Sequence, residues 1–132
     1  MNRNMIINGI DSESINLYQE LLEYGFEDVI FIDSNIDKVK DMNDKFSNTI
    51  AFFGNSGSPE FLEFVGINRV NSETIFIAMT QSDSINLISC EIAKYKYDLK
   101  NIVSVVNSKE NISLFNAYGI TELYFQGRSV LE

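Results

Sequence analysis

The sequence is poor in residues that carry much of enzyme and metal chemistry. Histidine is absent from its 132 residues, and cysteine and proline each occur once. The lack of histidine excludes histidine-containing zinc sites and histidine-based acid–base catalysis, and we predict no metal site. The lone cysteine, Cys90, cannot form an internal disulfide, which suits a reducing cytosol. It falls within a predicted helix, where we expect a small buried apolar residue.

Basic residues and long apolar runs are also scarce. The 10 lysines and arginines are outnumbered by 19 acidic residues, which gives a net charge of −9. Such a surface repels a polyphosphate backbone, so we expect no nucleic-acid partner. The charge excess is typical of a well-solvated surface, and an acidic docking face is the alternative. No apolar run approaches the roughly 18–20 residues that cross a bilayer, so we expect no direct membrane insertion.

What the chain does contain is an alternation of short apolar runs and amphipathic segments. With 45% apolar residues and a single proline, it can build one compact core. The runs are β-branched without polar alternation, which indicates strands covered on both faces. The helical segments between them indicate right-handed βαβ units. We therefore predict one doubly wound, Rossmann-like α/β domain with a parallel sheet over residues 1–123. Strands are expected at 5–8, 29–32, 49–53, 74–79 and 102–106, with a sixth from Ile120.

Serine residues mark the expected starts of four helices, at Ser34, Ser58, Ser82 and Ser108. Ser34 is followed three residues later by an aspartate, as in a capping box. Ser58 is followed by proline at the first helical position. The apolar residues of the fourth helix recur at helical spacing, and the fifth helix is expected to turn its apolar residues inward. These residues are Ile85, Ile88, Ile92 and Tyr95 in the fourth helix, and Ile112, Phe115 and Tyr118 in the fifth.

The last residues carry a different kind of signal. Residues 123–127 match the core of a common engineered protease site, and Leu131-Glu132 resembles the remnant of a cloning junction. We therefore expect residues 124–132 to be a tail derived from cloning. The natural protein is then expected to continue beyond the edge of this domain.

The first predicted strand ends in a turn that is similar to a dinucleotide-binding βα unit. The pattern G-x-G-x-x-G would fall on Gly9, Asp11 and Ser14, and only the first of these is glycine. The second glycine normally lets the backbone approach a pyrophosphate, whose charge rests on the helix N-terminus. Here a carboxylate takes that place. Gly9 itself is either part of a phosphate-facing turn or a strand-to-helix turn that needs a positive φ.

Asp11 has two interpretations. As an N-cap it would accept backbone N–H bonds and occupy the phosphate's place electrostatically, whereas the alternative is an ordinary cap in a crevice without function. A pyrophosphate within about 4 Å of the carboxylate would meet a repulsion of about 4 kcal/mol at an effective dielectric constant of about 20. This exceeds the roughly 0.3–1 kcal/mol that a helix dipole supplies. We therefore expect nucleotide binding to be weakened or lost.

Further motifs follow in a fixed order along the chain. The strand, turn and helix from Ile6 to Gly25 come first, and the strand at 29–32 then ends in Asp33. Gly54-Asn55-Ser56-Gly57-Ser58-Pro59 precedes a helix that ends in Gly66-Ile67. Ala78-Met79-Thr80-Gln81-Ser82-Asp83 opens the fourth helix, and Val105-Val106-Asn107 precedes a helix that ends in Gly119-Ile120. Each motif is weak alone. Together, over nearly the whole chain, they resemble the N-terminal domain that regulates potassium conductance, the RCK or TrkA-N type.

The resemblance implies a function as well as a fold. In that family the domain lies on the cytoplasmic side of a potassium channel or transporter. It binds NAD(H), ADP or ATP at the strand ends and assembles into dimers or rings. For this chain the resemblance implies a non-enzymatic, ligand-sensing or assembly domain that forms a homo-oligomer and acts on a membrane-embedded potassium channel or transporter subunit. Its cofactor would be one of these nucleotides, or none.

The Rossmann pattern and the resemblance together give eight candidate cofactor-binding residues: Gly9, Ile10, Asp11, Asp33, Ser34, Asn55, Ser56 and Thr80. Asp33 either hydrogen-bonds a ribose hydroxyl or begins the next turn. Asn55 stands where the family usually has aspartate, and Ser104 where many members have an arginine that would contact phosphate. Thr80 and Asn86 either line the adenosine side or are cap and helix-surface residues.

Two other functions fit the sequence. A nicotinamide-dependent oxidoreductase uses the same fold, but the chain has no Tyr-x-x-x-Lys pair and no histidine base, and we see no second domain for a substrate. A scaffold that binds no nucleotide and provides only subunit contacts is the other alternative. Binding of NADH with turnover would indicate the oxidoreductase, and binding without turnover would indicate the sensor.

Overall fold

The computed structural model describes residues 3–71 and 73–124. Within them, six strands form one parallel sheet in the order β3-β2-β1-β4-β5-β6. The strands are β1 (Arg3–Asn8), β2 (Phe26–Asp33), β3 (Thr49–Phe53), β4 (Ile75–Ala78), β5 (Asn101–Val105) and β6 (Thr121–Leu123). The predicted doubly wound, Rossmann-like fold is confirmed. The tail predicted at 124–132 lies outside the described residues except for Tyr124.

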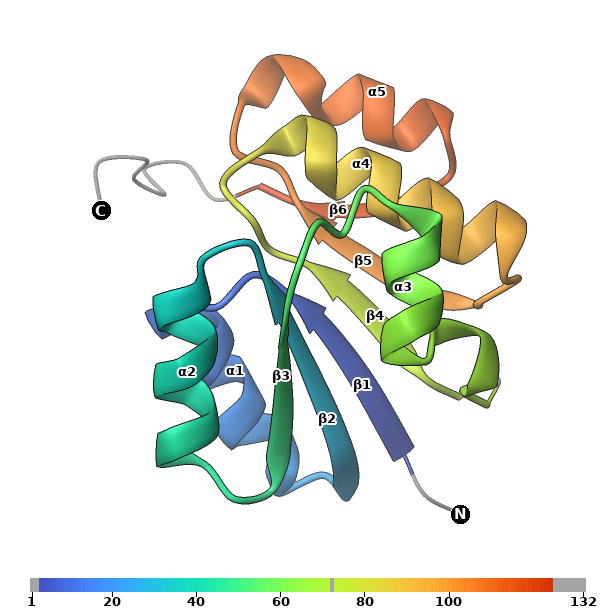
Figure 1. Ribbon diagram of the computed structural model, residues 1–132. Helices are drawn as coiled ribbons and strands as arrows, with labels where there is room; N and C mark the ends of the chain where they lie inside the picture. The colour runs from blue at the N-terminus through green and yellow to red at the C-terminus, as the bar shows by residue number, and fades with distance from the viewer. Residues whose placement is uncertain (1–2, 72, 125–132) are drawn as a thin grey trace.

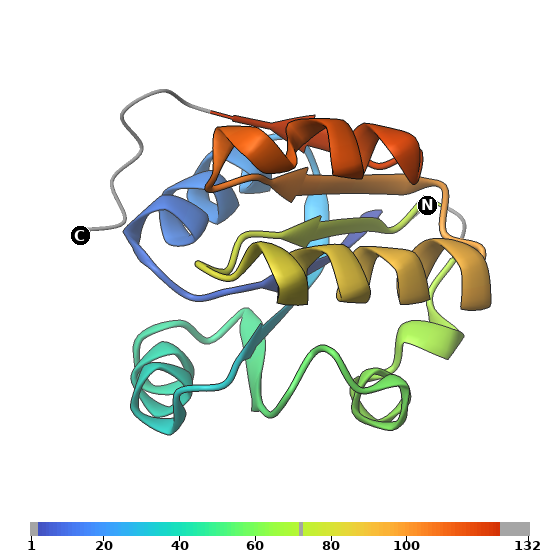
Figure 2. The same cartoon turned by 90° about the horizontal axis from the view of Figure 1, so that it is seen from above.

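Five α-helices connect the strands and cover both faces of the sheet (Figure 1). They are α1 (Ser12–Leu22), α2 (Ile36–Lys45), α3 (Pro59–Val65), α4 (Asp83–Glu91) and α5 (Ile112–Ala117). One core lies under α1 and α2, and a second lies under α3, α4 and α5. Figure 2, seen from above, shows α4 and α5 running along β4 and β5. No helix among the described residues is both long and apolar enough to span a bilayer.

Strand β1 shows why the apolar runs lack alternation. Met5, Ile6 and Ile7 each have no exposed surface. Successive side chains of a strand point to opposite faces, so Ile6 enters the core under α3–α5 while Met5 and Ile7 enter the core under α1 and α2. A strand that is buried on both faces needs an apolar residue at every position, as the sequence predicted.

The order of the strands fixes where a ligand site can lie. From β1 the chain builds β2 and β3 on one side, then crosses over and builds β4, β5 and β6 on the other. Strands β1 and β4 are therefore neighbours whose following loops diverge, and they pair in parallel from Met5↔Ile75 to Asn8↔Ala78. In open α/β sheets this point of divergence leaves a crevice at the carboxyl ends of the strands.

Helix α4 buries a different face from the one that its large apolar residues predict. Ile88 is 41% exposed, whereas Asn86, Ser89 and Cys90 are fully buried. Hydrogen bonds compensate the burial of the polar pair, since Asn86 donates to the Val105 carbonyl and Ser89 accepts from the Asn8 side chain. The helix continues as a π-helical segment, Ile92–Lys96, on which Tyr95 is 64% exposed. In α5, Phe115 is buried as predicted, but Tyr118, which directly follows the helix, is 42% exposed.

Two of the four predicted serine caps are confirmed. Ser58 and Ser82 accept backbone N–H bonds from Phe61 and Ile85 at the starts of α3 and α4. The prediction for Ser34 was wrong, because Asn35 is the N-cap of α2. Its side-chain oxygen accepts from the backbone N–H groups of Asp37 and Lys38.

Ser108 does not act as a side-chain cap either. It precedes a single 3₁₀ turn, Lys109–Asn111, and its side chain makes no capping hydrogen bond. Its backbone N–H donates to Asp83 instead. The Asp83 carboxylate therefore fixes Ser108 through its backbone, and it accepts from a different donor than a capping hydroxyl would.

The cysteine is buried as predicted. Cys90 lies in α4 with no exposed surface and belongs to the core under α3–α5. Burial raises the pKa of its thiol to about 12, with a smaller opposing effect of a hydrogen bond with Ser104. At neutral pH the group is therefore a neutral thiol without the thiolate character that redox chemistry needs.

Candidate functional site

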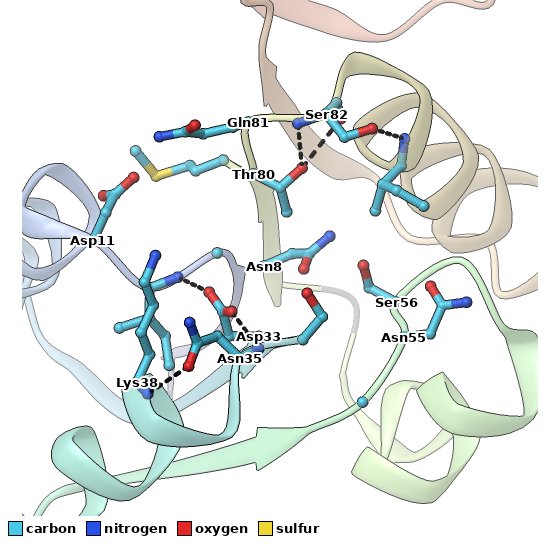
Figure 3. A pocket seen from close by; sticks show the side chains of 16 residues that line it. Asn8, Asp11, Asp33, Asn35, Lys38, Asn55, Ser56, Thr80, Gln81 and Ser82 are labelled. Atoms are coloured by element: carbon cyan, nitrogen blue, oxygen red, sulfur yellow. Dashed lines mark hydrogen bonds between the residues drawn. The ribbon is translucent and has the colours of Figure 1, made fainter. Parts of the chain in front are cut away.

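A polar pocket of about 550 Å³ opens at the crevice between β1 and β4 (Figure 3). Its walls come from the ends of four neighbouring strands and the segments that follow them. These are residues 8–11 at the end of β1, 33–38 at the end of β2, 54–56 after β3 and 79–85 after β4. These segments are far apart in sequence and meet only because the strands are parallel and end at the same edge. The volume falls within the range of about 300–1,000 Å³ that is usual for small-molecule sites.

All eight candidate residues line this pocket: Gly9, Ile10, Asp11, Asp33, Ser34, Asn55, Ser56 and Thr80. That they bind a ligand stays a prediction. Eight further lining residues were not predicted from the sequence: Asn8, Asn35, Lys38, Gly54, Met79, Gln81, Ser82 and Ile85. Most of the missed positions directly adjoin predicted ones on the same loops, and Lys38 is the one whose charge changes the chemistry.

Asp11 is the N-cap of α1. Its backbone is extended, and its Oδ1 accepts from the Ser14 backbone N–H at 2.8 Å. Ser14 Oγ in turn accepts from the Asp11 backbone N–H at 3.0 Å, which completes a capping box. The residues at the second and third glycine positions of the nucleotide motif therefore bond each other, and they use donors that a phosphate would otherwise contact.

Gly9 is required by packing, whatever the ligand. Its φ is +115°, and a Cβ placed on it would lie 2.8 Å from the backbone carbon and oxygen of Met79. The two chain segments touch because Met79 donates its N–H to the Asn8 carbonyl, which extends the β1–β4 pairing by one residue. This contact explains the glycine without any phosphate, and it supports the strand-to-helix interpretation.

Asp33 joins the first two loops. Its Oδ2 accepts from the Ile10 backbone N–H at 2.8 Å, and its Oδ1 accepts from the Asn35 backbone N–H at 2.8 Å. The carboxylate therefore begins the turn into α2, as the alternative interpretation predicted. Each of its oxygens keeps a second lone pair that a ligand hydroxyl could use.

Lys38 supplies positive charge at the pocket. Among the described lining residues it is the only cation, against the two carboxylates of Asp11 and Asp33. Its side chain extends from α2 towards the loop that carries Asp11 (Figure 3). Lys38 is the third residue of α2, and the first turn of a helix favours acidic residues over basic ones. A lysine that breaks this local rule is the sequence signal that could have identified it.

The opposite wall is neutral and internally hydrogen-bonded. Asn55 Oδ1 accepts from the Gly57 N–H at 2.9 Å, which braces the loop after β3. Thr80 Oγ1 donates to Asn86 Oδ1 at 2.6 Å and fixes the loop after β4. Asn86 is fully buried behind Thr80 and does not line the pocket, so neither interpretation offered for it, adenosine contact or helix surface, is right.

The fifth strand contributes no residue to the pocket. Ser104, which stands where many family members have arginine, is fully buried in β5 and donates to the Val105 carbonyl. It is absent from the pocket lining. Within residues 3–71 and 73–124 no group of three or more acidic or cysteine side chains is placed to hold a metal ion. The pocket offers amides, hydroxyls and carboxylates that can bind and orient a polar ligand.

Comparison with known proteins connects this arrangement to one family. The pattern of the TrkA-N domain matches residues 5–125, which include every wall of the pocket and all of the sheet except the first two residues of β1. The chain belongs to the TrkA-N domain family. The resemblance inferred from the order of motifs is therefore confirmed.

Individual relatives of this TrkA-N domain are distant. The Trk system potassium uptake protein TrkA of Vibrio alginolyticus is 23% identical over 86 residues, which are 65% of this chain and 18% of that protein. The TrkA-N domain of the inner membrane protein ybaL from Escherichia coli superimposes with a TM-score of 0.77 at 13% identity, over 99% of this chain and 93% of that one. The GsuK channel bound to NAD has a TM-score of 0.76 at 17% identity, over 93% and 21%. GsuK has also been seen bound to ADP. The chain spans about one-fifth of the length of TrkA and of GsuK.

Proposed function

We propose that this TrkA-N domain is a cytoplasmic regulatory domain of a potassium channel or transport system, in which binding of nucleotides through a diphosphate is weakened or lost. The observation that carries the proposal is the family match over residues 5–125 together with a pocket kept at the β1–β4 crevice. TrkA and GsuK, which share the domain type, are a potassium uptake protein and a channel. We propose a non-enzymatic role, which the match to the TrkA-N domain supports.

The capping box supports the weakening of nucleotide binding. A diphosphate on the first turn of α1 would lie beside the Asp11 carboxylate, which already accepts from Ser14. The repulsion of like charges about 4 Å apart, about 4 kcal/mol at an effective dielectric constant of about 20, exceeds the gain from the helix dipole. Lys38 reduces this repulsion but does not cancel it, because Asp33 adds a second carboxylate to the same pocket.

Asp11→Gly tests this step directly. The substitution restores the second glycine of the motif and removes the charge, and glycine is a tolerable N-cap that costs only a few tenths of a kcal/mol relative to aspartate. We expect isothermal titration to show affinities for NAD and ADP at least about tenfold higher than those of the wild type. Asp44→Asn, on the exposed side of α2 and outside the pocket, changes the net charge equally and should have no effect. If Asp11→Gly binds no better than the wild type, repulsion by Asp11 is not the cause, and the nucleotide-free scaffold is favoured.

The partners are also part of the proposal. We propose a homo-oligomer that acts on a membrane-embedded potassium channel or transporter subunit. Its support in this chain is a set of large apolar side chains that are exposed on α4, on the π-helical segment after it, and on and directly after α5. They are Ile88, Tyr95, Leu114 and Tyr118. Multi-angle light scattering on the purified chain tests the homo-oligomer. A strict monomer at high concentration would contradict it.

Transport measurements test the regulatory role itself. Cells that lack the gene are expected to take up rubidium, a tracer for potassium, at a rate that no longer adjusts when external potassium is changed. Reintroduction of the intact gene should restore the adjustment. A deletion strain whose uptake matches the parent strain at both low and high potassium would contradict the role in potassium transport.

A further inference from the structure

We propose that the pocket accepts a nucleoside with a positively charged 5′ substituent in place of a nucleoside diphosphate. This inference rests on the proposed function, because it concerns the ligand of the same pocket. It depends on three features: the hydrogen-bond donors of the β1–α1 turn, the balance of charge around them, and the groups left for a sugar and a base.

Four donors of the β1–α1 turn are used within the chain. Four backbone N–H groups of this turn donate to protein acceptors, and these are Gly9 to the Ile32 carbonyl, Ile10 to Asp33, Asp11 to Ser14 Oγ and Ser14 to Asp11. The distances run from 2.7 to 3.0 Å, so these bonds are well formed. A phosphate could contact these four N–H groups only by displacing their present acceptors. At these four positions the turn therefore no longer offers the donors that nucleotide sites normally provide, and Asp11 adds an acceptor there.

The charge of the pocket also favours a positively charged 5′ group. Asp11 and Asp33 contribute two negative charges and Lys38 one positive charge, so the described lining residues carry a net charge of −1. The sticks in Figure 3 show Asp11 and Lys38 on one side of the pocket and Asn55 and Ser56 across from them. A cationic 5′ group beside Asp11 is attracted where a phosphate is repelled, and it can donate to the carboxylate as well.

The rest of the pocket suits a ribose and a base. Asp33 has a lone pair left on each oxygen for sugar hydroxyl groups, since each oxygen accepts one N–H at 2.8 Å. Ile10, Met79 and Ile85 give the lining an apolar part, and hydroxyls and amides supply the polar part. An apolar wall with a few placed polar groups is the usual character of a small-molecule site. The volume of about 550 Å³ leaves room for a nucleoside and a short substituent.

A matched ligand series separates charge from shape. The three probes are 5′-amino-5′-deoxyadenosine, adenosine and adenosine monophosphate, which share the base and the ribose and carry a positive, a neutral and a negative 5′ group at pH 7. Isothermal titration of the wild type is expected to give the tightest binding for the amine, at least about tenfold tighter than for the monophosphate. ADP and NAD should bind no better than the monophosphate. Added salt should narrow the difference, because screening weakens charge attraction.

Asp11→Asn tests whether Asp11 sets this order. Asparagine is as good an N-cap as aspartate, so α1 should keep its start, and only the charge is removed. The amine is then expected to lose its advantage over adenosine, whereas Asp44→Asn should keep the wild-type order. Tighter binding of the monophosphate or of ADP than of the amine would overturn the inference, and so would the absence of binding by all probes. Either result leaves the regulatory role to be decided by rubidium uptake, so the two failures can be told apart.

Discussion

Replacement of Gly9 by alanine is expected to lower the free energy of unfolding by about 2–6 kcal/mol, since overpacking costs about 1–3 kcal/mol and a left-handed backbone at a residue with a side chain costs about 1–3 kcal/mol. Both costs apply here. The φ of Gly9 is +115°, and the new Cβ would lie 2.8 Å from the Met79 carbon and oxygen and 3.0 Å from the Thr80 nitrogen. These are backbone atoms of a paired segment, so they cannot rotate away as a side chain would.

Gly25 provides the matched control for this substitution. It also has a positive φ, +89°, but a Cβ placed there would meet no atom within 4 Å. Gly25→Ala should therefore lower the free energy of unfolding only by the backbone strain. The difference in this loss between Gly9→Ala and Gly25→Ala measures the contact between the β1–α1 turn and the end of β4. Urea unfolding followed by circular dichroism gives both values. Equal losses would show that the crevice relaxes around the added methyl group, contrary to the packing described here.

The strands were predictable because burial on two faces leaves a local trace. A strand covered on both sides is apolar at every position, and β4 was expected at 74–79 and found at Ile75–Ala78. The ends of the parallel strands follow from the same reasoning, since all of them face one edge of the sheet. That is why all the candidate residues, chosen from the sequence, lie together around one pocket.

The buried face of α4 could not be read in the same way. Its apolar spacing favours Ile88, yet Asn86 and Ser89 are buried instead. Their burial depends on partners that lie far away in sequence, since Ser89 bonds Asn8 across 81 positions and Asn86 bonds Val105 across 19. A hydrophobicity pattern treats an asparagine as a surface residue because it contains no information about such partners.

The second prediction concerns Asp83, the first residue of α4, whose carboxylate joins this helix to the loop before α5. Its Oδ1 accepts from the backbone and side-chain nitrogens of Asn107 at 2.7 and 2.9 Å, and its Oδ2 accepts from the Ser108 backbone and the Asn111 side chain at 3.0 and 2.8 Å. Asparagine offers one acceptor oxygen and turns an NH₂ group towards the remaining donors. We expect Asp83→Asn to lower the free energy of unfolding by about 2–4 kcal/mol at pH 7, because several charge-assisted hydrogen bonds are lost together.

The effect of Asp83 should depend on pH in a defined direction. Burial opposes ionisation of this carboxyl group, but the hydrogen bonds from Asn107, Asn111 and Ser108 outweigh burial and hold its pKa below the ordinary value. A lowered pKa in the folded state stabilises the protein above the unfolded-state pKa of about 3.9, and this stabilisation is lost as the pH falls through the folded-state value. The difference between wild type and Asp83→Asn, measured by urea unfolding, should therefore be full at pH 7 and shrink at acid pH.

Asp41→Asn is the control for the loss of a carboxylate as such. Asp41 pairs with Lys45 at 2.9 Å on the surface of α2, and both side chains are more than half exposed. Exposed pairs of this spacing contribute about 0.3–0.5 kcal/mol, so this variant should remain close to the wild type at neutral and at acid pH. If Asp83→Asn is no more costly than Asp41→Asn, the four hydrogen bonds to Asp83 add little to stability. The start of α4 and the loop before α5 would then be held by the neighbouring Thr80–Asn86 and Asn86–Val105 bonds.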